Sequence, residues 1–355
     1  MKINLMTATL AAGDAIGNYI AMLQPAFSTR HEVVVYADRG TAERPFLPSF
    51  AYVATPDDVL WFHYSIYSEN FACLKRRGPD FKIMDFHGIC PPEFFADDER
   101  EMKRLTSRAL RELPSLRDVF DLCLVHSDYS AGVLRKAGYE RIVKTPLAIG
   151  RALAQADEHP FLAEHLSQIE YLLFVGRVVV QKDLTGAIEL FARVRERRPQ
   201  LKMWIVGDRS GSPQYQQQIA ALLARVSVER DVGFTGRLSD PSLLKPFFKY
   251  ARLFLTLSRW ESFCVPVVEA MGFGVPTATT EQTCLPEILG ETGLLLDRAD
   301  IGSAADQIAN LLDDGKQYDE LRRRCLERAP QFSEERMVEA LVDVEERWFP
   351  HAIPQ

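Results

Sequence analysis

Short apolar runs separated by stretches of helical character recur along this 355-residue chain, and no other feature limits its fold as strongly. In the first half the runs cover residues 3–6, 32–36, 58–62, 81–86 and 122–125. In the second half they cover residues 171–177, 201–207, 232–236, 251–257 and 277–279. The connections are long enough for helical crossovers, which strands need in order to pair in parallel. The pattern therefore predicts an α/β protein with doubly wound, Rossmann-like parallel sheets.

The length of the chain suggests two domains, each large enough to bury its own core. Between the two sets of apolar runs, residues 151–170 are polar and without pattern, which is typical of a linker. Ser333 and the acidic residues after it have the pattern of a capping box at the start of a last helix. We expect domains at 1–150 and 171–331, the linker at 151–170 and a C-terminal helix at 332–355.

Composition and charge exclude several classes of function. The net charge of −7 supplies no field that would attract phosphate backbones, so we expect no nucleic-acid partner. Six cysteines without a Cys-x-x-Cys pair indicate reduced thiols, and no apolar stretch reaches the ~18 residues that span a bilayer. The N-terminus lacks the pattern of a signal peptide. We therefore expect a cytoplasmic protein.

Residues 99–117 are basic, with six basic and three acidic side chains on a segment of helical spacing. Such a face can lie on anionic lipid, here the inner face of the plasma membrane, at about 1 kcal/mol per basic residue near the surface. The alternative, which we favour, is a solvated helix face above a core stripe.

Two carboxylates, Glu261 and Glu269, stand eight residues apart where an apolar run gives way to a helix. Pro266 suits the first position of that helix, so we expect Glu261 in the loop and Glu269 in the first helical turn. Ligands of open α/β folds bind at this edge of the sheet. Taken singly, each is more simply read as a solvated loop charge or as a favourable charge near a helix N-terminus.

The pattern Ser-x-x-Glu-Ser-Phe-x-x-Pro-x-x-Glu-Ala-Met-x-x-Gly-x-Pro at 258–276 resembles the nucleotide-sugar signature of retaining glycosyltransferases of the GT-B fold, family 4. The resemblance implies two Rossmann-like domains facing across a cleft, with the C-terminal helix packing back on the first. It implies that Glu261 lies by the donor sugar and that Glu269 bonds the nucleotide ribose. The same donor-binding loop holds Phe263, Cys264 and Val265. Cys264 stands where the family usually has Gly, in a turn whose amides approach the donor.

Arg177 and Lys182 form a second constellation at the end of the run 171–177. Gly-Arg-x4-Lys resembles the family's phosphate-binding pair, which implies that these cations stabilise the departing diphosphate. A pair of surface cations is the plainer alternative. Gly207, which ends the run 201–207, and Leu238, which by resemblance flanks the nucleobase, complete the expected donor site.

Two histidines follow apolar runs of the first half, and a lone histidine is more often structural than catalytic. His87 lies in Asp-Phe-His-Gly-Ile-Cys-Pro-Pro, which resembles the family's strand, histidine, loop and proline element. The resemblance implies that His87 positions the transferred sugar, and His63 is a weaker candidate. Gly13 and Gly17 could form a phosphate or acceptor loop before a helix, or simply mark the start of that helix.

The residues and the resemblance together predict a retaining glycosyltransferase that moves a hexose from a UDP- or GDP-linked donor to a hydroxyl of a glycan or lipid-linked acceptor, in bacterial surface polysaccharide assembly. No Asp-x-Asp occurs in the chain, so we expect neither metal nor other cofactor. A nucleotide-sugar epimerase of the same fold is one alternative. A non-catalytic sugar-nucleotide or glycan-binding module is another, since fold alone does not fix activity.

Overall fold

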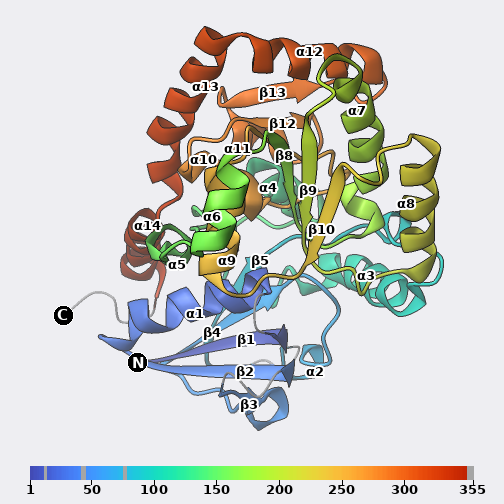
Figure 1. Cartoon of the computed structure of the whole chain (residues 1–355). Coiled ribbons are helices and arrows are strands. Elements are labelled where there is room, and N and C mark those ends of the chain that lie inside the picture. Colours follow the sequence, from blue (N-terminus) through green and yellow to red (C-terminus); the bar gives the residue numbers. More distant parts are fainter. Residues whose placement is uncertain (12–13, 41–44, 75–77, 350–355) are drawn as a thin grey trace. The chain divides into compact units, whose positions relative to one another are not determined.

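The computed structural model describes residues 1–11, 14–40, 45–74 and 78–349, and it divides into two compact units (Figure 1). The first unit consists of Met1–Pro92, Glu101–Gly150 and Phe332–Gln355. The second consists of Glu93–Arg100 and Arg151–Gln331. The expected α/β class with two doubly wound parallel sheets is confirmed.

The first unit is built on a seven-stranded parallel sheet in the order β3-β2-β1-β4-β5-β6-β7. Its strands are β1 (Lys2–Leu10), β2 (Glu32–Gly40), β3 (Leu47–Pro48), β4 (Asp58–Tyr64), β5 (Phe81–Phe86), β6 (Leu122–Val125) and β7 (Ile142–Lys144). The helices of this unit are α1 (Ala15–Ser28), α2 (Phe71–Leu74), α3 (Arg100–Glu112), α4 (Asp128–Lys136) and α14 (Glu334–Trp348). The strand order reverses at β1, which has β2 on one side and β4 on the other.

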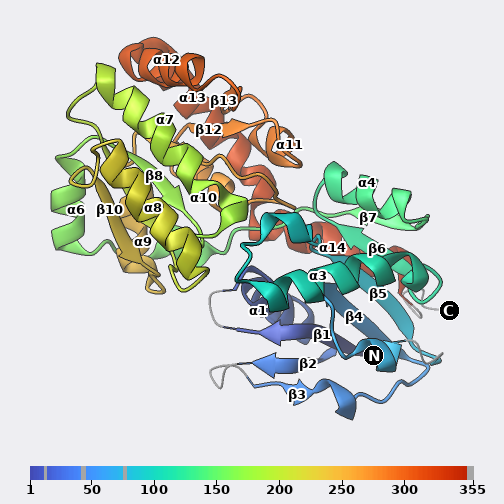
Figure 2. The ribbon, with the colours of Figure 1, turned by 90° about the vertical axis from the view of Figure 1, so that its right-hand side faces the viewer.

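Side chains alternate between the two faces of β4, and this alternation separates two layers. Phe62 and Tyr64 join a core with residues of α3 and α4, and Figure 2 shows α3 lying along the sheet. Trp61 and His63 point to the opposite face, where α1 contributes Phe27 against Trp61 and Tyr19 against His63. The central strands are therefore covered on both faces.

The C-terminal helix belongs to the first unit, as expected. Glu345 of α14 accepts from Arg30 at 2.7 Å and meets His31 Nε2 at 2.6 Å, both at the end of α1. Phe349 then packs edge-on against Trp61 of β4. The Ser333 side chain accepts from the Arg336 amide, which confirms Ser333 as the N-cap. The predicted capping box is wrong, because the third helical position holds Arg336 and not a glutamate.

The second unit has a six-stranded parallel sheet in the order β10-β9-β8-β11-β12-β13. Its strands are β8 (Tyr171–Val175), β9 (Lys202–Val206), β10 (Val232–Gly236), β11 (Leu253–Leu255), β12 (Thr277–Thr280) and β13 (Gly293–Leu296). Its helices are α5 (Arg151–Gln155), α6 (Pro160–Ser167), α7 (Leu184–Arg197), α8 (Pro213–Arg225), α9 (Pro241–Lys249), α10 (Val265–Gly272), α11 (Leu285–Leu289), α12 (Ile301–Asp313) and α13 (Gly315–Arg328). The strand order reverses at β8, between β9 and β11, which is where ligands bind in such sheets.

Two stretches differ from the domain limits expected from the sequence. Residues 151–170 contain α5 and α6 and pack on α9, where Lys245 Nζ donates to the carbonyl of Ala154 at 2.8 Å. They therefore belong to the second unit and are not a free linker. Residues 93–100, expected in the first domain, also group with the second unit, because Asp98 accepts from the Gln214 amide and Arg259 lies over Phe94.

The basic segment 99–117 forms α3 and a 3₁₀ turn at Leu113–Leu116, and it has internal partners for several cations. Arg104 pairs with Glu101 and Arg108 with Glu112, while Ala109 and Leu113 are buried. This arrangement fits the solvated-face alternative. Among the described residues, no helix combines the length and apolar character needed to cross a bilayer.

Gly207 lies where the ends of β8 and β9 approach most closely. The amide of Gly176 donates to the carbonyl of Val206 at 2.9 Å. The amide of Gly207 donates to the carbonyl of Gly236, also at 2.9 Å. A Cβ atom on Gly207 would lie 1.8 Å from the carbonyl oxygen of Gly176. No side chain fits there, so Gly207 fixes the spacing of the strands that carry the site.

We expect Gly207→Ala to lower the free energy of unfolding of the second unit by about 3 kcal/mol, because two strand ends must separate. Gly236→Ala is the matched control. Gly236 also has a positive φ of 72°, but its Cβ would meet nothing within 4 Å, so only about 1–2 kcal/mol of left-handed strain is expected. Urea unfolding of both variants measures the difference, and equal losses would contradict the close approach.

Candidate functional site

Two of the predicted residues of the second unit form a buried ion pair at the carboxyl edge of its sheet. Lys182 ends a 3₁₀ turn at Val180–Lys182, just after β8, and Glu261 follows β11. The Lys182 Nζ lies 2.5 Å from Glu261 Oε1, and the Glu261 side chain is only 8% exposed. The Glu261 amide donates to Thr283 Oγ1 at 3.1 Å, which fixes the loop. Burial alone would lower the pKa of Lys182, but the Glu261 carboxylate raises it overall.

Arg177 supplies a second cation beside this pair. It follows β8, is exposed, and has no hydrogen-bond or ion-pair partner among the described residues. Its charge acts on Lys182 and on Asp208, which places it at the same sheet edge. An anionic ligand here would meet one paired and one unpaired cation.

The loop before α10 has an unusual backbone at Cys264. Its φ is 70° and its ψ is 69°, the left-handed conformation that favours glycine, at about 1–2 kcal/mol for other residues. This is the position where the sequence departs from the family's glycine. The thiol is buried, and burial with the nearby Glu261 carboxylate raises the pKa of Cys264 well above its ordinary value. An unreactive thiol therefore lines the turn.

The remaining donor-site candidates lie along the same edge with different exposures. Phe263 is 4% exposed, so its ring belongs to the packing under the loop, while Val265 begins α10 and is partly exposed. Leu238 lies in the loop between β10 and α9 and is partly exposed. Val265 and Leu238 can therefore contact a ligand more readily than Phe263 can.

Glu269 is the fifth residue of α10, so it lies in the second helical turn and not in the first as expected. The difference arises because the helix begins at Val265, one residue before Pro266. Glu269 has no hydrogen-bond partner among the described residues, and burial raises its pKa to about 7. Its carboxyl group is therefore poised to change charge near neutral pH.

In the first unit, His63 and His87 come together at the carboxyl ends of β4 and β5. His63 Nδ1 lies 3.0 Å from His87 Nε2. Two residues that sequence reasoning missed complete the group. Asp85, fully buried, meets His126 Nε2 at 2.9 Å and accepts from Trp61 Nε1 at 2.9 Å.

Strand register and side-chain alternation explain this gathering. His63 is the register partner of Asp85 in the β4·β5 pair, and both point to the α1 face. In β6, Leu124 is the register partner of Asp85, and His126 lies two residues further on the same face. The sequence signal was therefore present, as polar residues at period two in neighbouring apolar strands.

Burial and mutual charge set the protonation of this group. Burial lowers the pKa of His63 to about 4 and that of His87 to about 3. Burial would raise the pKa of Asp85, but the surrounding histidines hold it well below its ordinary range. Ligand atoms of His63, Asp85 and His87 also lie within 4.8 Å of one another, so among the described residues these three could hold a metal ion.

The expected glycine loop is only partly described. Gly13 lies outside the described residues. Gly17 is buried in the first turn of α1, where its amide meets the Asp14 side chain at 3.4 Å, and a Cβ there would lie 2.5 Å from the carbonyl oxygen of Ala11. These contacts favour the alternative in which Gly17 belongs to a capped helix start packed against β1.

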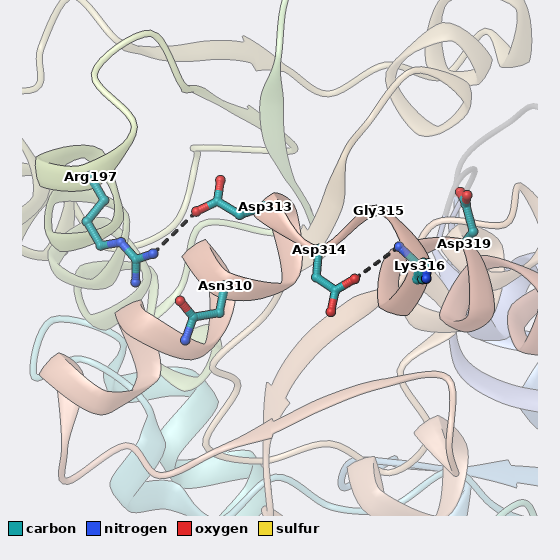
Figure 3. A pocket seen from close by; sticks show the side chains of 7 residues that line it. All are labelled: Arg197, Asn310, Asp313, Asp314, Gly315, Lys316 and Asp319. Carbon is teal, nitrogen blue, oxygen red and sulfur yellow. Dashed lines mark hydrogen bonds and ion pairs between the residues drawn. The ribbon is translucent and has the colours of Figure 1, made fainter.

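A separate surface pocket lies among α7, α12 and α13 (Figure 3). Arg197 pairs there with Asp306 and Asp313, and Asp314 caps α13 by accepting from the amides of Lys316 and Gln317. Arg197 and the Asp314 carboxylate thus have partners of their own. The pocket lies where α7 ends and leads to the start of β9, which is the edge opposite the candidate site.

Comparisons with known proteins agree with this geometry. A family model described as glycosyl transferases group 1 matches residues 157–332. The O-antigen chain mannosyltransferase B of Escherichia coli is 29% identical over 278 residues, which cover 72% of this chain and 70% of that relative. The solved structure of sucrose-phosphate synthase from Thermosynechococcus elongatus has a TM-score of 0.78 at 16% identity and covers 98% of both chains. HepE from Anabaena, in complex with UDP and glucose, has a TM-score of 0.77 at 17% identity and covers 98% of this chain and 100% of its own.

At 16% and 17% identity, the two solved structures show the fold alone. The family match spans Arg177, Lys182, Glu261 and Glu269, the polar residues at the carboxyl edge of the second sheet. The protein therefore belongs to the group 1 glycosyltransferases and has the GT-B fold.

Proposed function

We propose that the protein transfers a hexose, with retention at the anomeric carbon, from a UDP- or GDP-linked donor to a hydroxyl of a glycan or lipid-linked acceptor. The observation that carries the proposal is the buried Lys182–Glu261 pair beside the unpaired Arg177. A mannosyltransferase among the relatives and the UDP and glucose bound to HepE support a nucleotide-linked hexose as donor.

In this proposal the two cations stabilise the leaving group. When the bond between the anomeric carbon and the phosphate oxygen breaks, the nucleoside diphosphate gains negative charge, and preorganised cations lower the barrier at that moment. Lys182 is held charged by Glu261, and Arg177 is always charged. The transfer is proposed to need no metal ion, because these two side chains stabilise the charge of the departing diphosphate in its place.

Each remaining residue is given one contact. Glu261 accepts from a hydroxyl of the donor sugar while it pairs with Lys182. Glu269 accepts from the ribose hydroxyls, Leu238 flanks the base, and His87 bonds the sugar. The acceptor hydroxyl attacks from the face that the diphosphate leaves, and its proton goes to the departing phosphate oxygen. This route needs no enzymatic nucleophile and gives retention.

The proposal places the reaction in the cytoplasm, in the assembly of a bacterial surface polysaccharide. The O-antigen mannosyltransferase among the relatives supports that role. The described cysteines form no disulfide, which agrees with a reducing compartment. A peripheral contact of α3 with the membrane surface is a weaker part of the proposal, since Arg104 and Arg108 already pair with acids of the same helix.

Arg177→Ala is expected to lower kcat for nucleotide release by about 10²-fold, because one preorganised charge on the leaving group is lost. Arg177 is exposed, so the urea midpoint of the variant should stay unchanged. Release is measured with UDP- and GDP-hexoses in the presence of EDTA. Arg193→Ala is the matched control, because Arg193 is an exposed cation of α7 paired with Glu196. Full turnover by Arg177→Ala would sink the leaving-group assignment.

The Michaelis constant for the donor is expected to rise as pH falls from 8 to 6. The carboxyl group of Glu269 has a pKa raised to about 7, so it is ionised above that pH and accepts strong hydrogen bonds from ribose, whereas below it the group is protonated. Glu269→Gln should show a high, nearly pH-independent constant. A pH-independent constant in the unaltered protein would contradict the ribose assignment.

A further inference from the structure

The first unit buries a cluster of four ionisable side chains at the carboxyl ends of three adjacent strands. This histidine cluster consists of His63, Asp85, His87 and His126. Tyr19 of α1 lies edge-on above all three imidazole rings, at centroid distances of 5.4–5.8 Å. His63 Nε2 is buried without a hydrogen-bond partner among the described residues. Burying this many polar groups costs free energy, so we looked for a function that would explain the cluster.

Hydrogen-bond geometry fixes the protons of His126. Its Nδ1 lies 3.2 Å from the carbonyl oxygen of Thr145, and its Nε2 lies 2.9 Å from Asp85 Oδ1. Both neighbours are oxygen acceptors, so each ring nitrogen carries a proton to donate. His126 therefore holds one oxygen of the buried Asp85 carboxylate, whose other oxygen accepts from Trp61.

The proton of His63 can be placed by comparing its two nitrogens. Nδ1 lies 3.0 Å from His87 Nε2, and each of these two nitrogens lies within 3.7 Å of an Asp85 carboxylate oxygen, so the deciding atom is Nε2 of His63. Nε2 has no partner, and a buried N–H without an acceptor is rarer than an unused lone pair. His63 thus carries its proton on Nδ1 and donates it to His87.

The tautomer of His87 follows from its neighbour. His87 Nε2 accepts from His63, so the single proton of the neutral ring lies on Nδ1. That nitrogen has no partner among the described residues and is absent from the buried unpaired atoms, so it is the ring nitrogen that solvent reaches. His87 turns an N–H outward.

We propose that Asp85, His126 and His63 are positioning residues that hold His87 as its Nδ1–H tautomer, so that His87 donates a hydrogen bond to an oxygen of the bound substrate. The choice of substrate rests on the proposed function. The consequence is specific: His87 positions a sugar oxygen as a donor and does not act as the base that deprotonates the acceptor.

A metal ion is the competing use of the same atoms, since His63, Asp85 and His87 offer ligands within 4.8 Å of one another. Metal-bound histidines usually donate their other N–H to a carbonyl or carboxylate. His63 Nε2 has no such partner, and both oxygens of Asp85 already accept N–H bonds. The contacts therefore favour a proton, and not a metal ion, between the two rings.

Nitrogen-15 NMR of the full chain labelled at histidine tests the tautomers without any substrate. We expect His87 and His63 each to be protonated on Nδ1 alone at neutral pH. His63→Asn and His87→Asn spectra assign the signals. A proton on Nε2 of His87 overturns the proposal, as does stoichiometric binding of Zn²⁺ that is lost in His63→Asn. If no donor is turned over, the proposed function fails while this spectrum still decides the inference.

Variants of His87 test the outward N–H in turnover. His87→Asn can place an amide N–H near the position of Nδ1, whereas His87→Gln extends its amide toward the buried Nε2 position. We expect His87→Asn to stay within about 10-fold of the unaltered kcat and His87→Gln and His87→Ala to lose about 10²-fold. His165→Asn, at an exposed histidine of α6, is the control. Equal kcat values for the Asn and Gln variants, at equal unfolding midpoints, would overturn the donor role.

Discussion

Parallel pairing is the constraint on which the rest of this structure depends. Because all strands of a sheet point the same way, the loops that follow them meet at one edge, and polar residues distant in sequence become neighbours. Lys182 after β8 and Glu261 after β11 meet in this way in the second unit. Asp85 within β5 and His126 after β6 meet in the same way in the first.

The two units offset the free-energy cost of burying a charged side chain in different ways. In the second unit one lysine and one carboxylate pair while Arg177 stays exposed, which leaves a cation without a partner among the described residues at that edge. In the first unit both oxygens of the buried Asp85 carboxylate meet ring nitrogens, one of His126 and one of Trp61. Breaking either buried pair would leave one charge uncompensated, which typically costs several kcal/mol.

Much of the fold could be predicted from the sequence because parallel strands buried on both faces appear as plain apolar runs. Residues 151–170 could not, since α5 and α6 are short and depend on contacts with α9 rather than on their own pattern. The assignment of Arg177, Lys182 and Glu261 to one site was within reach through two motifs. The histidine cluster was harder to predict, because polar residues at period two in neighbouring apolar runs form a group only once the strand register is known.

Two turn positions likewise show what the sequence predicts and what only the structure explains. Gly207 was assigned to donor binding from its place after an apolar run, and the structure adds a steric reason for it in the approach of Gly176. Cys264 was recognised as a departure from glycine, and the structure gives it the left-handed backbone that glycine would adopt. In both cases the residue's neighbours in space, which the sequence does not show, decide its physical role.

The most direct test of the central claim is the stereochemistry of donor hydrolysis, followed by proton NMR with EDTA present and water as the acceptor. A leaving group stabilised by Arg177 and Lys182, with attack on the face that it vacates, predicts that an α-linked UDP- or GDP-hexose first releases the α-anomer of the free sugar. Initial release of the β-anomer would contradict the proposed mechanism. Release that stops with EDTA and returns with a divalent cation would contradict the role given to the two cations.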